Sequence, residues 1–83
     1  MEKITENIDW KNFIHSDKNI LSGKPVIKGT RISVEFILNL YSQGWSEEDI
    51  LNEYDHLTRE SLRAVFAYLE DCIKNDFLYI KAS

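Results

Sequence analysis

The sequence GKPVIKGTRI, residues 23–32, decides the fold, because it joins a turn-rich arm to the first of three helix signals. Pro25 has no backbone donor, which places it at the edge or the start of a strand. Gly23 and Gly29 permit backbone angles that other residues rarely adopt. Across residues 13–32, short apolar pairs alternate with turn formers, and this pattern predicts a short β-hairpin or arm.

Three hydroxyl side chains after the arm have the properties of helix N-caps, because each can accept a hydrogen bond from an unpaired backbone N–H of the first turn. The helices that they predict end at about Ser42, Tyr54 and Asn75. Gly44 is a usual residue just beyond a helix C-terminus. The predicted caps are Ser33, Ser46 and Thr58.

Apolar residues around each cap support these helix starts. In all three cases the residue before the cap and the fourth helical residue are apolar, an arrangement that fixes the angle at which the chain enters the helix. The pairs are Ile32 with Ile37, Trp45 with Ile50, and Leu57 with Leu62. The apolar face predicted for the third helix consists of Leu62, Val65, Phe66, Leu69 and Ile73.

These elements predict a mainly α fold, a three-helix domain with the architecture of many helix-turn-helix folds, preceded by a short β-hairpin or arm. The 83 residues allow one domain. Within it we expect an N-terminal segment at 1–12, the β arm at 13–32, the trihelical core at 33–75 and a C-terminal tail at 76–83.

Composition and charge limit the functions that the chain can have. The net charge is −4, so binding to DNA would need local basic patches, whereas a basic protein partner would suit the overall charge. No apolar run is long enough to span a membrane, and the single Cys72 cannot form an internal disulfide. Both features predict a cytoplasmic protein with no membrane partner.

The arm carries one of two groups of candidate DNA-binding residues, namely Lys24, Lys28 and Arg31. One interpretation of this segment is structural only, with glycines for turns and a proline for stiffness. The other is that the three cations form a basic patch for phosphate or for the acidic active site of a partner protein. The spacing of Gly, Lys and Ser/Thr is not that of a phosphate-binding Walker loop.

The second group of candidates is Arg59 and Arg63 on the predicted third helix. If any helix enters a DNA groove it is this one, because the second helix presents acidic residues that would repel phosphates. The alternative is a solvated helix face, in which both arginines pair with acidic neighbours. The acidic neighbours expected for that pairing are Glu60, Glu70 and Asp71.

Nothing in the sequence predicts catalysis. His15, His56 and Cys72 have no spacing typical of a metal site, and the serines and threonines are explained as caps and turn residues. We therefore expect no enzyme activity, no cofactor and no metal. The apolar tail Phe77-Leu78-Tyr79-Ile80 is β-prone, and it would cover the core or bind a partner or a second copy by adding a strand.

Three stretches resemble the bacterial domain-of-unknown-function family four hundred and thirty-three: GKPVIKGTRI at 23–32, GWSEEDILNEY at 44–54 and HLTRESLRAVFAYLED at 56–71. The resemblance extends over roughly residues 13–71. Two departures are Asp17-Lys18 and Tyr54-Asp55, where the family commonly has Asp-Pro and Tyr-Pro. The loss of proline relaxes both turns and leaves the expected fold unchanged.

The resemblance implies a homeodomain-like helix-turn-helix protein that acts as an antitoxin. We expect an antitoxin-like component of a bacterial toxin-antitoxin pair, which neutralises a PIN-like ribonuclease toxin and has operator DNA as a further partner. The alternative is a dimeric protein-protein interaction module that does not bind DNA. A homodimer is expected in either case.

Overall fold

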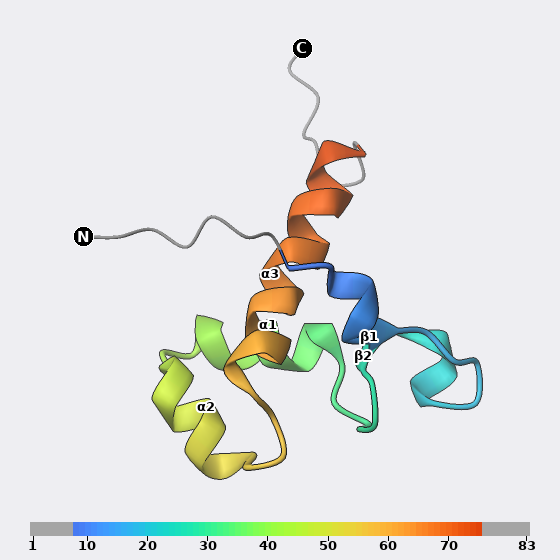
Figure 1. Cartoon of the computed structure of the whole chain (residues 1–83). Coiled ribbons are helices and arrows are strands. Elements are labelled where there is room, and N and C mark those ends of the chain that lie inside the picture. The colour runs from blue at the N-terminus through green and yellow to red at the C-terminus, as the bar shows by residue number, and fades with distance from the viewer. Residues whose placement is uncertain (1–7, 76–83) are drawn as a thin grey trace.

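The structure, a computed structural model, describes residues 8–75 of the chain, and the predicted tail contact at Phe77–Ile80 lies outside this range (Figure 1). Within the described residues the chain is mainly helical, with three α-helices preceded by a two-stranded antiparallel hairpin, as the sequence predicts. Its elements in chain order are the 3₁₀ turn η1 (Trp10–Asn12), β1 (Ile14–His15), the 3₁₀ turn η2 (Leu21–Gly23), β2 (Val26–Ile27), α1 (Val34–Ser42), α2 (Glu47–Glu53) and α3 (Arg59–Lys74).

The predicted arm is a short hairpin that is tied directly to the first helix. Ile14 pairs with Ile27, and β2 also forms a bridge to the start of α1 between Val26 and Ser33. The backbone N–H of Val34 donates to the carbonyl of Pro25 at 2.9 Å. Residues 23–32 therefore connect the hairpin to α1 and fix where α1 begins relative to the hairpin.

All three predicted caps are confirmed, and their hydrogen bonds are local. Ser33 accepts from the backbone N–H of Phe36, while Ser46 and Thr58 each form a capping box with the residue three positions later. The helix ends differ from the prediction by one residue, because Tyr54 and Asn75 cap α2 and α3 without being part of them. These reciprocal bonds satisfy backbone donors that the first turn of a helix leaves unpaired.

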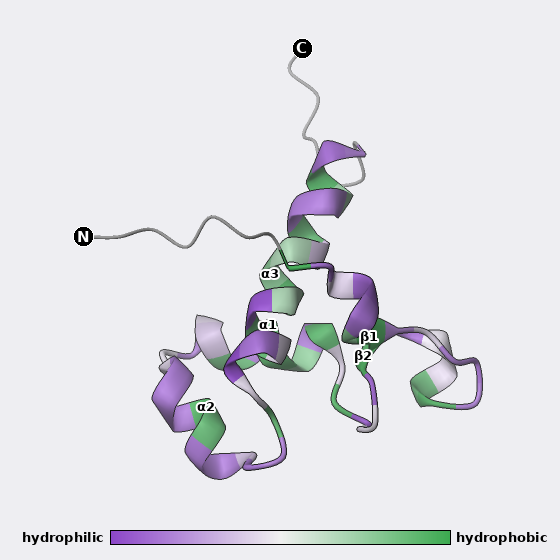
Figure 2. Cartoon of the chain, viewed as in Figure 1, coloured by the Kyte–Doolittle hydropathy of each residue, from purple (hydrophilic) through white to green (hydrophobic). Residues whose placement is uncertain are grey.

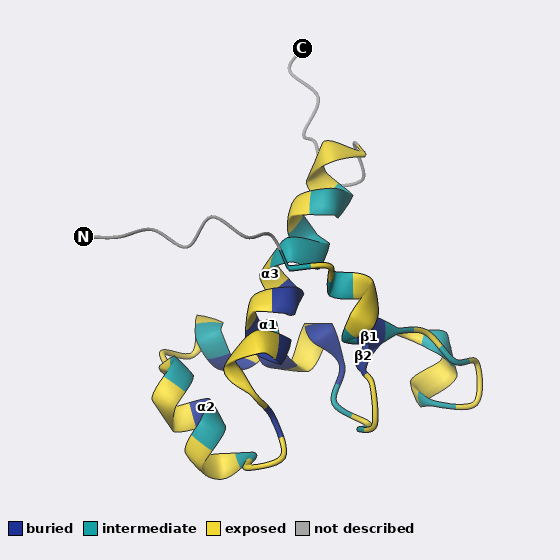
Figure 3. Ribbon diagram, in the orientation of Figure 1, coloured by how far each residue is buried: buried dark blue, intermediate teal, exposed yellow. Residues whose placement is uncertain are grey.

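The core lies where the hairpin and the three helices meet (Figure 3). The fourth residue of each helix, Ile37, Ile50 or Leu62, is almost completely buried, which agrees with the predicted apolar pairs around the caps. The other buried apolar residues are Ile14, Val26, Ile27, Val34, Leu40, Leu57, Ala64 and Val65. No helix within residues 8–75 is long and apolar enough to cross a membrane.

The apolar face predicted for the third helix is only partly correct. Leu62 and Val65 are buried, but Phe66 is 47% exposed and Ile73 is 43% exposed. Figure 1 shows that the C-terminal half of α3 extends beyond α1 and α2 and that η1 lies beside it, which explains the exposure of Ile73. Figure 2 shows hydrophobic residues in this half of α3, and Figure 3 shows that none of the residues in this half is buried.

Another side of the C-terminal half of α3 packs against η1. Trp10 of η1 packs edge-on against Tyr68, with 4.9 Å between the ring centroids. Its indole N–H donates to the carboxylate of Asp71 at 2.5 Å. The prediction that Asp71 pairs with an arginine of its own helix is therefore wrong, because a residue 61 positions away occupies this carboxylate.

Candidate functional site

The turn that leads from β2 to α1 presents two of the predicted arm cations. Thr30 closes this turn, since its backbone N–H and its hydroxyl both donate to the carbonyl of Ile27, and its hydroxyl accepts from the N–H of Ile32. Gly29 has a φ of +80°, in the left-handed region that glycine tolerates best. The result is a closed turn from which the exposed Lys28 and Arg31 extend into solvent.

Lys24, the third cation of the predicted patch, is already paired. Its ammonium lies 3.0 Å from the carboxylate of Glu35 in the first turn of α1, and both side chains are mostly exposed. Within residues 8–75, Lys28 and Arg31 form no ion pair. The structure thus separates the predicted arm patch into one paired cation and two cations that are available to an acidic partner.

The two candidate arginines of α3 have different surroundings. Arg59 forms ion pairs with Glu47 and Glu48 of α2, and the distance to Glu48 is 2.9 Å. The hydrogen bond and the charge of Arg59 lower the pKa of Glu48, and the same contacts raise the pKa of Arg59. The predicted pairing of Arg59 within its own helix is wrong, because α2 and α3 meet at this point and bring the acidic first turn of α2 to it.

Arg63 lies one turn further along α3 and is exposed. It forms no ion pair with any residue in the range 8–75. Glu70, predicted to pair with an arginine, instead lies 3.8 Å from Lys74 within the same helix, and both of those side chains are mostly exposed. Exposed pairs of this length contribute little to stability, so Glu70 can form other contacts.

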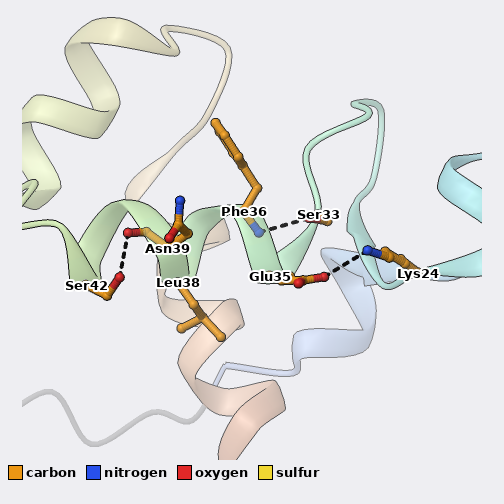
Figure 4. Close-up of a pocket in the computed structure, with 7 residues that line it drawn as sticks. All are labelled: Lys24, Ser33, Glu35, Phe36, Leu38, Asn39 and Ser42. Carbon is orange, nitrogen blue, oxygen red and sulfur yellow. Dashed lines mark hydrogen bonds and ion pairs between the residues drawn. The ribbon is translucent and has the colours of Figure 1, made fainter.

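A shallow hollow of about 580 Å³ lies along the outer side of α1 (Figure 4). Most of its polar groups are used in local bonds: Ser33 caps the helix, Ser42 donates to the carbonyl of Asn39, and Lys24 pairs with Glu35. These polar groups are therefore engaged in contacts within the chain. Its lining residues are Lys24, Ser33, Glu35, Phe36, Leu38, Asn39 and Ser42.

The remaining titratable groups do not converge on a reactive site. No group of three or more potential metal-ligating side chains occurs among the described residues. His15 has a buried Nε2 with no hydrogen-bond partner in that same range. Burial raises the pKa of Tyr68, as does its hydrogen bond with Cys72, which places these two side chains together on α3.

The sequence analysis missed an exposed apolar surface on α3. We name Phe66, Leu69 and Ile73 the α3 stripe, since they follow one another at intervals of three and four residues on one side of the helix. Tyr41 of α1 lies at the inner end of the stripe, with its ring centroid 5.2 Å from that of Phe66. The periodicity was visible in the sequence, but it does not tell a core face from an exposed one.

Comparison with known proteins places the chain in a family. A family model described as "Protein of unknown function (DUF433)" matches residues 14–69. The chain also resembles the crystal structure of a DUF433 member protein from Anabaena variabilis, with 29% sequence identity and a TM-score of 0.71. That alignment covers 78% of this chain but 64% of the other, so this chain spans less than two thirds of that relative.

Among curated proteins, no match to the sequence was found. The family model nevertheless covers most of the chain, from β1 through the hairpin, α1 and α2 and into α3. The chain therefore belongs to the DUF433 family.

Proposed function

We propose that the chain is an antitoxin-like protein that binds and neutralises a PIN-like ribonuclease toxin. One observation carries the proposal. The segment that resembles the DUF433 family most specifically forms a closed turn, and this turn presents Lys28 and Arg31 without a carboxylate partner in residues 8–75. Two cations on a rigid turn suit an acidic surface, such as the active site of such a ribonuclease.

The physical basis of the proposal is preorganisation. Because Thr30 and Gly29 already hold the turn, less conformational entropy is lost when Lys28 and Arg31 bind than would be lost by a flexible loop. The role that we propose is one of binding, and the polar groups of the hollow along α1 serve local bonds. We place the protein in the cytoplasm, where its cysteine would stay reduced.

Co-expression tests this function. The chain is expressed together with the neighbouring reading frame, and we expect it to relieve the growth arrest that this frame causes alone. Replacing both turn cations, Lys28→Glu with Arg31→Glu, should weaken binding of the purified toxin by about 30-fold or more, because it sets like charges against each other. Lys18→Glu is the matched control, since Lys18 is an exposed lysine in the preceding turn region.

Two results would contradict the proposal in different ways. If the wild-type chain does not relieve the arrest, the antitoxin-like role is wrong. If it does, and the doubly substituted chain binds as tightly as the Lys18→Glu control, the toxin is bound at another surface and the assignment to the turn is wrong.

Operator DNA is a second candidate partner. The observation in its favour is Arg63, an exposed arginine on the third helix without an ion pair in residues 8–75. Arg59 counts against it, because two carboxylates of α2 surround its guanidinium and would lie close to the DNA phosphates. We therefore rank DNA binding below toxin binding.

Measuring whether the chain binds the promoter of its own gene, with and without the toxin, tells a DNA-binding protein from a protein-protein interaction module. Affinity that falls steeply with salt and is lost on replacing Arg59 and Arg63 with Glu would support the operator role. If no salt-dependent binding is measured, the chain is a protein-protein interaction module that does not bind DNA.

A further inference from the structure

The α3 stripe is a pronounced exposed apolar feature of residues 8–75. Phe66 and Ile73 are nearly half exposed, whereas the fourth residue of each helix is completely or almost completely buried. The C-terminal half of α3, which carries Leu69 and Ile73, extends beyond α1 and α2, so a second long helix could lie beside it (Figure 1). Large apolar side chains that gather on one helix face mark interaction surfaces.

Charges beside the stripe favour a second copy of this chain as its partner. Arg63 and Glu70 lie on the same edge of the stripe, two helical turns and therefore about 10 Å apart. They carry opposite charges, and neither has a strong partner within residues 8–75. An antiparallel copy of the same helix would place its glutamate near the arginine and its arginine near the glutamate, which is the self-complementarity that a two-fold interface requires.

We propose that two copies of this chain pair through the α3 stripe, with their α3 helices antiparallel and the two-fold axis between Phe66 and Leu69. In this arrangement Phe66 of each copy packs on Leu69 of the other, and Arg63 forms an ion pair with Glu70 of the other copy. The protruding end of each α3 lies beside the body of the second copy, where Ile73 can pack near Tyr41.

The spacing of the stripe fits helix pairing. Phe66, Leu69 and Ile73 have the alternating intervals of three and four residues that place apolar side chains on the seam of two packed helices. Arg63 and Glu70 then occupy one flanking position of successive heptads, and in such pairs charges at the flanks select partner and orientation. In an antiparallel pair this flanking position of both helices lies on the same side of the seam, so Arg63 faces Glu70 of the other copy, whereas a parallel pair would place the two flanks on opposite sides and leave this attraction unused.

This interface is separate from the proposed toxin-binding turn. It uses the α3 stripe with Arg63 and Glu70, whereas the toxin contact uses Lys28 and Arg31 between β2 and α1. Loss of dimerisation and loss of toxin binding can therefore be measured independently, and failure of one proposal leaves the other standing.

Sedimentation equilibrium of the full chain tests the interface. We expect a monomer–dimer equilibrium at micromolar concentration, on the scale of small and weak interfaces. Phe66→Ser with Ile73→Ser should raise the dissociation constant by about 30-fold or more, because both large apolar side chains lie in the contact. Leu21→Ser is the matched control, since Leu21 is 40% exposed but lies in η2, away from the stripe.

Charge reversal gives a stricter test that leaves the apolar stripe intact. Arg63→Glu alone and Glu70→Arg alone should each raise the dissociation constant by about tenfold, because each sets like charges against one another across the pair. The variant that carries both substitutions should regain most of the affinity, since the opposite charges are restored with their positions exchanged. Circular dichroism of every variant checks that the helices are retained.

Three results would overturn the proposal. The first is a chain that stays monomeric up to about 1 mM, well above the range of weak specific interfaces. The second is a dimer that the stripe substitutions do not weaken, or whose double charge reversal does not recover. The third is a monomer in which NMR signals of Phe66 and Ile73 shift on replacing Phe77 and Ile80 with Ser, since the chain's own tail would then cover the stripe.

Discussion

Thr30 is the residue on which the geometry of the candidate site depends most directly. Three hydrogen bonds converge on it, two to the carbonyl of Ile27 and one from the backbone N–H of Ile32. The hydroxyl both donates and accepts, which a side chain of the same shape without oxygen cannot do. The positions of Lys28 and Arg31 follow from this one side chain.

Replacing Thr30 with Val tests that dependence. The substitution keeps the branched shape and removes two hydrogen bonds, so we expect a loss of about 1–2 kcal/mol in the free energy of unfolding. Urea denaturation measures the loss, and Thr30→Ser, which retains the hydroxyl, should lie within about 0.5 kcal/mol of the wild type. Equal losses for the two variants would show that the hydroxyl does not hold the turn.

The pairing of Arg59 with α2 gives a second prediction at the scale of a single residue. Because Arg59 lowers the pKa of Glu48 in the folded state, the contribution of this pair is present above the ordinary carboxylate pKa and is lost as pH falls through the lowered value. We expect an NMR titration to show Glu48 with a pKa below its ordinary value of about 4.3. In Arg59→Gln it should return towards that value, and an unchanged titration would contradict the pairing.

At the scale of single elements, the helix caps stabilise the starts of the helices. Ser46 and Thr58 each form a reciprocal capping box, so each satisfies backbone donors that would otherwise be unpaired. The start of α3 matters most, because Arg59 and Arg63 lie in its first turns and move with it. A frayed start would also disturb the contact between α2 and α3.

We predict that Thr58→Ala lowers the free energy of unfolding by about 1 kcal/mol, as does Ser46→Ala. The control is Ser42→Ala, because the hydroxyl of Ser42 bonds to a carbonyl of its own helix at an exposed position and contributes little. Thermal unfolding followed by circular dichroism ranks the three variants. A loss for Ser42→Ala as large as that for the caps would show that capping is not the cause.

At the scale of the whole molecule, a small core joins the hairpin to the three helices. A chain of 83 residues buries only about 60–65% of its surface on folding, so each fully buried side chain carries a large share of the stability. Ile37 is at the centre, with none of its surface exposed, and it lies in the helix that the hairpin positions.

Truncating Ile37 in two steps tests the role of this core. We expect Ile37→Val to cost about 0.5–1.5 kcal/mol and Ile37→Ala about 2–5 kcal/mol, since the larger deletion leaves a larger cavity. Urea denaturation of both variants at one protein concentration gives the two values. Losses below about 0.5 kcal/mol for Ile37→Ala would place this residue outside the core.

The sequence alone determined the local structure of this protein. Three caps, the apolar pairs around them and the glycine after α1 define the helices to within a residue, because those contacts join residues at most five positions apart. Lys28 and Arg31 were predictable as candidates for the same reason, since the turn that presents them is built within residues 27–32. Binding to operator DNA, binding to a toxin and a contact made by the C-terminal tail stay predictions.

Only the tertiary structure decided which of the predicted groups are available to contact a partner. Arg59 is paired with carboxylates eleven and twelve residues earlier, and Asp71 with a tryptophan 61 residues earlier. The same packing leaves Phe66 and Ile73 exposed, although their periodicity is that of a core face. A helical period reports only that one side is apolar, and what covers that side depends on segments distant in the sequence.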